Sequence, residues 1–137
     1  MPRGWTWGPA QPKNIPATVQ ASTRKRIEEH AAKNFAGRYA RLDIRFRGRF
    51  CYVDAFKEPD VKHDAPPGWF EGTAEQWWQQ MRDTPLHLIR LTYTGDVEKW
   101  ELAFFTYSNE KYSECVFPDG QFEGVPEQGF DIGATYL

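Results

Sequence analysis

Arginine and tyrosine side chains recur in four segments of the chain that are expected to be strands. The residues that combine the two chemistries are Arg41, Arg45, Tyr52, Arg90 and Tyr107. A guanidinium group donates forked hydrogen bonds to carboxylates and phosphates, and an aromatic ring stacks on flat molecules. Arginine and tyrosine are also enriched where one protein surface binds another. These residues therefore predict a surface for a small anionic or aromatic ligand, or for a second protein surface.

Acidic residues are expected on the same surface, and they limit what it binds. Asp43, Asp54 and Glu101 fall at alternating positions beside the arginines. Ion pairing would weaken the attraction of the arginines for phosphate. We expect a non-catalytic binding domain that forms a homodimer, binds such a ligand, or does both through this surface. A single-stranded nucleic-acid binder stays open as an alternative, because some RNA-binding sheets present aromatic and arginine side chains.

A second group of residues lies around the loop and helix expected over 58–78. His63 stands between two aspartates, and Trp69 and Trp77 are near it in the sequence. These three residues define a second candidate pocket, and with it the alternative of a small enzyme. The histidine lacks partners at zinc-site spacing, and no P-loop, GxGxxG, GxSxG or HExxH motif occurs. We therefore predict no catalytic residue, no metal site and no cofactor.

The first half of the chain predicts a helix followed by a hairpin. Pro16 suits a helix start and Gly37 a helix end, with apolar residues between them at four- and eight-residue spacing. Residues 40–46 alternate between apolar and polar, as in a strand, and residues 50–56 follow as a second strand. A turn at Arg47-Gly48 would pair Ile44 with Cys51, leaving the arginines on the opposite face.

The second half predicts another helix, another hairpin and a shorter end. Thr73 and Gln76 have capping-box spacing before a helix that Pro85 ends. Residues 86–94 and 99–107 form a hairpin that pairs Leu91 with Leu102 and places Leu88 on the reverse face. A fifth strand is expected near residues 112–117, and a final helix from residue 126. This order predicts an α+β fold: an antiparallel sheet of four to five strands with helices packed on one face.

Length and charge narrow the class of protein further. The 137 residues suit a single domain over residues 17–137, preceded by an irregular arm over residues 1–16 that contains Trp5 and Trp7. Residues 1–57 hold 12 basic and four acidic side chains, and residues 58–137 hold five basic and 15 acidic ones. The asymmetry disappears if the two halves intersperse on one surface, and it favours an anionic ligand or head-to-tail self-association if they do not.

Compartment and membrane association follow from the cysteines and from hydropathy. Two cysteines, Cys51 and Cys115, suit a reducing cytoplasm rather than a disulfide framework. No run of 18 apolar residues and no signal-peptide pattern occurs, so we expect a cytoplasmic protein without a membrane partner.

Two stretches resemble segments of small bacterial proteins of uncharacterised function. They are Phe46-Arg-Gly-Arg-Phe-Cys-Tyr-Val-Asp54 and Phe105-Thr-Tyr-Ser-Asn-Glu-Lys-Tyr112. The resemblance spans roughly residues 15–137 and implies a bacterial source. It implies no activity, because that group has none assigned.

Overall fold

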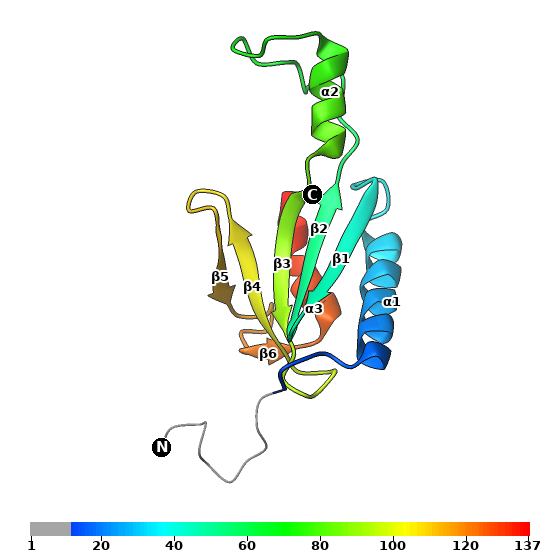
Figure 1. The fold of residues 1–137 in the computed structure, drawn as a ribbon, viewed down its shortest axis with the longest axis vertical. Helices are drawn as coiled ribbons and strands as arrows, with labels where there is room; N and C mark the ends of the chain where they lie inside the picture. Colours follow the sequence, from blue (N-terminus) through cyan, green and yellow to red (C-terminus); the bar gives the residue numbers. More distant parts are fainter. Residues whose placement is uncertain (1–11) are drawn as a thin grey trace.

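The computed structural model describes residues 12–137, and it has the α+β architecture that the sequence predicts. Trp5 and Trp7 of the expected arm lie outside the described residues. Five antiparallel strands follow one another across the sheet in chain order, and a short sixth strand extends the pairing of the fourth (Figure 1). The strands are β1 (Arg41–Arg47), β2 (Phe50–Phe56), β3 (Leu86–Thr92), β4 (Trp100–Thr106), β5 (Lys111–Cys115) and β6 (Glu123–Gly124).

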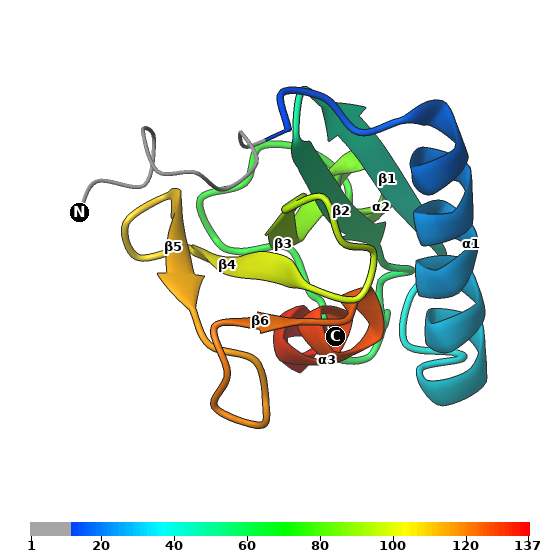
Figure 2. The ribbon, with the colours of Figure 1, turned by 90° about the horizontal axis from the view of Figure 1, so that it is seen from below.

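Two helices cover one face of this sheet. Helix α1 (Ala17–Asn34) packs against β1, and helix α3 (Pro126–Gly133) packs against α1, β3 and β4 (Figure 2). A 3-10 turn, η2 (Ala134–Tyr136), follows α3. The core between helices and sheet contains the fully buried Ile27, Val53, Leu91, Trp100 and Phe130. The second face of the sheet is turned away from both helices.

The register of the first hairpin differs by two residues from the predicted one. Arg47 pairs with Phe50, so the turn is Gly48-Arg49 rather than Arg47-Gly48. Gly48 has a φ of +60°, which a two-residue hairpin turn requires at its first central position and which glycine adopts at little cost. A two-residue shift leaves every side chain on its predicted face, but Ile44 now pairs with Val53 rather than Cys51.

The second hairpin has the predicted pairing, with one correction at Leu88. Ile89 pairs with Phe104 and Leu91 with Leu102, as expected. Between β2 and β3, however, the register shifts after Val53, because Ile89 pairs with Val53 while His87 pairs with Asp54. The extra residue of this bulge is Leu88, which is fully buried. The prediction that Leu88 lies on the reverse face is wrong, because a bulge changes the alternation of side chains along a strand.

Gly133 at the end of α3 permits the close contact with this bulge. A Cβ atom on Gly133 would lie 2.8 Å from Ile89 Cγ2 and 2.9 Å from Leu88 Cβ. We expect Gly133→Val to lower the free energy of unfolding by about 2–3 kcal/mol, because overpacking forces side chains or backbone to move. Urea unfolding measures the loss. Gln128→Val, on the exposed side of the same helix, should cost only about 0.5 kcal/mol, the helix propensity of valine; equal losses would contradict the close packing of Gly133.

The connection between β2 and β3 carries helix α2 (Ala74–Asp83), which projects beyond the end of the sheet (Figure 1). The predicted capping box is present: Gln76 N–H donates to Thr73 Oγ1, and Thr73 N–H donates to Gln76 Oε1. None of the residues of α2 is buried. None of the helices within residues 12–137 combines the length and apolar character that a membrane crossing requires.

Candidate functional site

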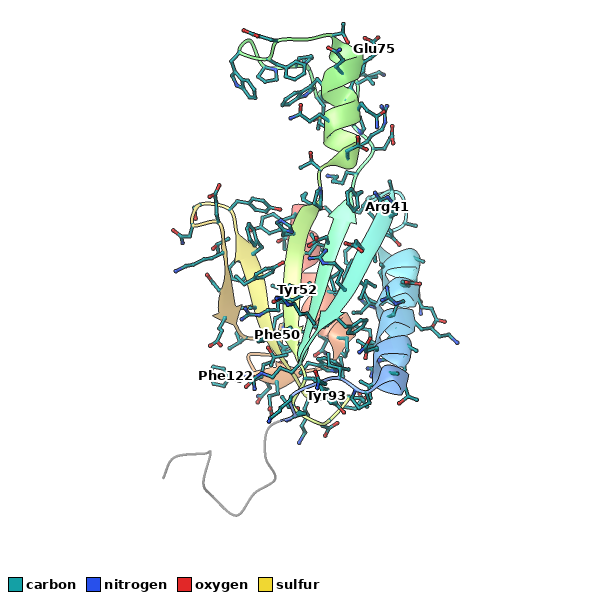
Figure 3. The ribbon with its side chains drawn as sticks, in the orientation of Figure 1. Arg41, Phe50, Tyr52, Glu75, Tyr93 and Phe122 are labelled. Carbon is teal, nitrogen blue, oxygen red and sulfur yellow. The ribbon has the colours of Figure 1, made fainter. Side chains whose placement is uncertain are left out.

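The cross-strand pairing brings three of the predicted site residues together on the second face. Arg45 of β1 pairs with Tyr52 of β2, and Tyr52 pairs with Arg90 of β3. The three side chains therefore form one row across the sheet, away from α1 and α3. Figure 3 marks Tyr52 near the middle of the sheet, with Phe50 of β2 on the same face and nearer the first hairpin.

Arg45 is already held by two carboxylates. Its Nη1 lies 2.7 Å from Asp54 Oδ2 and 2.6 Å from Asp43 Oδ2. The hydrogen bonds and charges of Asp54 and Asp43 raise the pKa of Arg45 despite its partial burial. Asp54 is 1% exposed, and its second oxygen lies 2.9 Å from His87 Nδ1. The guanidinium therefore balances a buried charge, and it has little capacity left for an anionic ligand.

Arg90 has a different environment, in which aromatic rings replace carboxylates. Its guanidinium lies 4.9 Å from the ring centre of Phe50 and 5.5 Å from that of Tyr112. Its Nε is buried and has no hydrogen-bond partner, and within residues 12–137 Arg90 forms no salt bridge. Burial, with the charge of Asp54, raises the pKa of Tyr112 to about 12, so its hydroxyl stays protonated at neutral pH. Cation–π contacts thus hold Arg90, and no carboxylate of residues 12–137 is in salt-bridge contact with it.

The remaining two residues predicted on this face lie at its other end. Arg41 stacks on Phe56, with 3.7 Å between the guanidinium carbon and the ring centre. The Tyr107 hydroxyl accepts a hydrogen bond of 2.7 Å from the backbone N–H of His87, and its ring packs against Tyr136. Neither Arg41 nor Tyr107 lines the depressions that contain Tyr52 and Arg90; Tyr107 lines a separate one beside α2.

A pocket at the first hairpin is lined by basic and aromatic side chains. We call it the hairpin pocket; it measures about 650 Å³ and is lined by Pro12, Lys13, Arg47, Gly48, Arg49, Phe50 and Tyr52. The backbone N–H of Ile15 donates to the Gly48 carbonyl at 3.1 Å, which fixes Lys13 beside the turn. Arg49 stacks on Phe50 at 5.6 Å. Among residues 12–137, no acidic side chain lines this pocket and none forms a salt bridge with its three cations.

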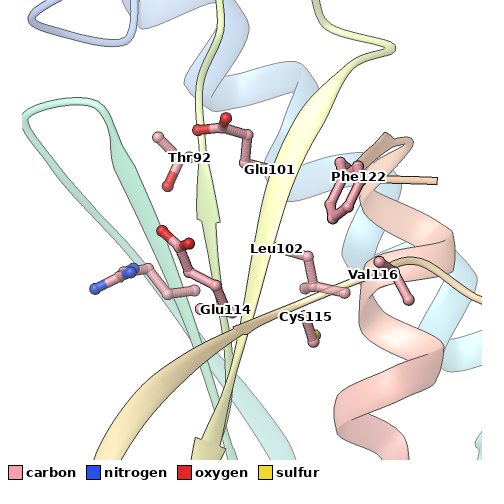
Figure 4. A pocket seen from close by; sticks show the side chains of 9 residues that line it. Thr92, Glu101, Leu102, Glu114, Cys115, Val116 and Phe122 are labelled. Carbon is pink, nitrogen blue, oxygen red and sulfur yellow. The ribbon is translucent and has the colours of Figure 1, made fainter. Parts of the chain in front are cut away.

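A second depression lies beside it, across β3 and β4. We call it the acidic groove; it measures about 390 Å³ and is lined by Arg90, Thr92, Glu101, Leu102, Ala103, Glu114, Cys115, Val116 and Phe122. Figure 4 shows the carboxylates of Glu101 and Glu114 on one side, and Val116 and Phe122 on the other. Because Phe50 pairs with Thr92 and Tyr52 with Arg90, the two depressions are adjacent. The second face is therefore positive at the hairpin and negative toward β5.

The second predicted group does not converge on one pocket. His63 Nδ1 lies 2.6 Å from Asp60 Oδ2 in an exposed loop, and this contact raises the pKa of His63. Trp69 and Trp77 pack on each other, with ring centres 5.8 Å apart. A separate depression between α2 and the sheet is lined by Lys57, Met81, Leu86 and Tyr107 among others, and by none of His63, Trp69 and Trp77. Within residues 12–137 no cluster of three metal-ligating side chains occurs.

The two cysteines are separate thiols. Cys51 pairs with Leu91, Leu91 with Leu102, and Leu102 with Cys115, so three strand spacings, roughly 14 Å, separate them. Burial raises the pKa of Cys51 to about 12. Neither thiol is activated as a nucleophile, because burial also raises the pKa of Cys115.

Sequence reasoning does not single out Lys13, Arg47 or Arg49 as site residues. With the turn expected at Arg47-Gly48, Arg47 is a turn residue rather than the last residue of a strand on the second face. The glycine itself is the missed signal, because a glycine suits the first central position of a two-residue turn and predicts the observed register. Lys13 is brought to the turn by the hydrogen bond between Ile15 and Gly48, which are far apart in the sequence, so no local pattern predicts its position.

Comparison with known proteins adds no family: no family model, no curated protein and no solved structure matches this chain. The function of this chain must therefore be inferred from the geometry of the site.

Proposed function

We propose that this protein is a binding domain whose hairpin pocket takes a small ligand carrying an anionic group on a flat aromatic ring. The observation that carries the proposal is the lining of that pocket: three cations beside two rings, without an acidic side chain from residues 12–137. Arg45, expected from the sequence to contribute, is not part of the proposed site because two carboxylates already hold it.

The cations supply affinity for the anionic group. Lys13, Arg47 and Arg49 come from two segments that meet at the turn, so their charges surround a single depression. Arginine donates paired hydrogen bonds to a phosphate or carboxylate, and lysine adds a point charge. Arg90 lines the adjacent acidic groove, but its guanidinium lies 4.9 Å from the ring centre of Phe50 and so adds a fourth positive charge beside the pocket. This concentration of charge favours an anion even where each exposed ion pair is individually weak.

The rings supply a platform for the flat part of the ligand. Phe50 and Tyr52 lie on the same face of β2 with ring centres 6.2 Å apart. Arg49 and Arg90 both lie within stacking distance of Phe50. A planar ligand that enters here gains ring–ring and guanidinium–ring contacts in addition to ion pairing.

The acidic groove restricts the length of an anionic ligand. A nucleotide offers a phosphate and a base together, so a single nucleotide suits the hairpin pocket. A single-stranded nucleic acid that continued across the sheet would place further phosphates beside Glu101 and Glu114. Like charges repel there, so we propose a small ligand rather than a single-stranded nucleic acid.

Titration of the full chain with phenyl phosphate, followed by ligand-observed NMR, tests this proposal. We expect saturable binding that weakens as salt is added, because the contacts are ionic. Arg47→Gln/Arg49→Gln should raise the Kd at least tenfold, equivalent to about 1.4 kcal/mol.

The matched control is Arg38→Gln/Arg41→Gln, which removes the same charge outside the pocket lining. This variant should bind phenyl phosphate as the unmodified chain does. An unchanged Kd in Arg47→Gln/Arg49→Gln, or an equal loss in both variants, would disprove a specific anion site at the hairpin.

A further inference from the structure

We infer that the hairpin pocket binds the projecting arm of a second copy of this chain, so that the protein associates head to tail. This inference rests on the proposed function of the pocket, and it names the ligand. This projecting arm is the segment over residues 57–85, and it is not the N-terminal segment over residues 1–16. Its tip is the segment over residues 65–81, which includes most of α2.

The tip presents an aromatic cluster whose outermost ring is largely exposed. The ring of Trp77 lies 4.9 Å from that of Phe70 and 5.8 Å from that of Trp69. Trp69 is 75% exposed, and α2 has no buried residue. An exposed group of large rings on an ordered element is typical of an interaction surface.

The tip is also purely anionic. Residues 65–81 contain Glu71 and Glu75 and no lysine, arginine or histidine. Both glutamates are exposed, and neither forms a salt bridge within residues 12–137. The Thr73–Gln76 capping box satisfies two N–H groups at the start of α2, and Glu75 lies in the first turn of that helix, where its charge also favours the helix dipole. Rings beside two carboxylates are the ligand chemistry that the hairpin pocket selects.

The pocket and the tip lie at opposite ends of the molecule. Figure 3 places Glu75 at one end of the longest axis, and Phe50 and Tyr93 toward the other end. The arm of one molecule therefore meets the pocket of another, and the two charged surfaces are complementary in sign. Because this contact joins two different surfaces, it generates a chain, a ring, or a two-fold dimer in which each arm enters the other molecule's pocket.

Sedimentation velocity with two complementary variants tests the inference. The arm variant is Trp69→Ala/Glu71→Gln/Glu75→Gln, and the pocket variant is Arg47→Gln/Arg49→Gln. We expect the unmodified chain to form larger species as concentration rises, and added salt to reverse this. Each variant alone should associate at least tenfold more weakly. An equimolar mixture should form a species of twice the monomer mass and nothing larger, since only one intact arm and one intact pocket remain per pair.

The outcomes separate this inference from the function proposed above. The arm variant keeps the pocket, so it should still bind phenyl phosphate, and Glu28→Gln/Glu29→Gln, which removes two exposed charges from α1, should associate like the unmodified chain. If the chain stays monomeric at every concentration, or the arm variant associates normally, head-to-tail association is wrong even where phenyl phosphate binds. If the monomeric chain does not bind phenyl phosphate, the proposed function is wrong.

Discussion

Replacing Phe130 by alanine should lower the free energy of unfolding by about 3–5 kcal/mol, the range for truncating a buried aromatic residue. Phe130 is fully buried at the centre of α3, and its ring meets that of Phe35 edge to face at 5.5 Å. It also lies 6.1 Å from the ring of His30 on α1. The substitution removes an apolar contact between α1 and α3, and the cavity left there closes only partly. Urea unfolding followed by circular dichroism measures the loss as a lower midpoint at constant slope.

The matched control is Phe122→Ala, because Phe122 is 78% exposed beside the acidic groove. This variant should change the free energy of unfolding by no more than about 0.5 kcal/mol. Equal losses in the two variants would show that α3 does not pack on the sheet as described.

Replacing Arg45 by alanine should cost about 3 kcal/mol, although half of this side chain is exposed. The reason is its partner: Asp54 is buried, and without Arg45 its charge keeps only the hydrogen bond to His87. Breaking a buried ion pair typically costs 3–5 kcal/mol, and the exposure of Arg45 places it at the lower end of this range. The measurement is the free energy of unfolding at pH 7.

Arg47→Ala controls for the loss of an arginine on the same strand and face. Arg47 has no salt bridge to a residue of the described chain, so its removal should cost no more than about 0.5 kcal/mol. Adding Asp54→Asn to Arg45→Ala should recover part of the lost stability, because it removes the uncompensated charge. No difference between the two arginine variants would contradict the role of Arg45 as the counterion of Asp54.

The fold was predictable where a local pattern decides it. Alternation along β1, paired with β2, assigns the faces of both strands correctly even with the register two residues off, because the side chains of a strand repeat every two residues. The helices were predictable from local signals too: the Thr73–Gln76 capping box marks the start of α2, and proline and glycine residues mark the ends of α1. Leu88 was not predictable in this way, because the alternation in the sequence does not mark the bulge, which appears only in the pairing of β3 with β2.

The candidate site was predictable only as a surface. Arg45, Tyr52 and Arg90 do share one row, but the two arginines have different partners: carboxylates hold Arg45, and aromatic rings surround Arg90. Whether an arginine is paired with acids or stacked on rings depends on neighbours from other strands, and these follow from the register. The hairpin pocket depends on the turn position and on Lys13, which a nonlocal backbone hydrogen bond brings near. A sequence pattern gives the period of a strand, but not these partners.

Amide chemical shifts of the isotope-labelled chain, recorded as phenyl phosphate is added, show where an anionic ring binds. We expect the largest changes at Lys13, Gly48, Arg49 and Phe50, with smaller ones along β3 near Arg90. Changes centred on Glu114 and Phe122 in the acidic groove, or no changes at the hairpin at a saturating concentration, would contradict the proposal that the hairpin pocket is the binding site.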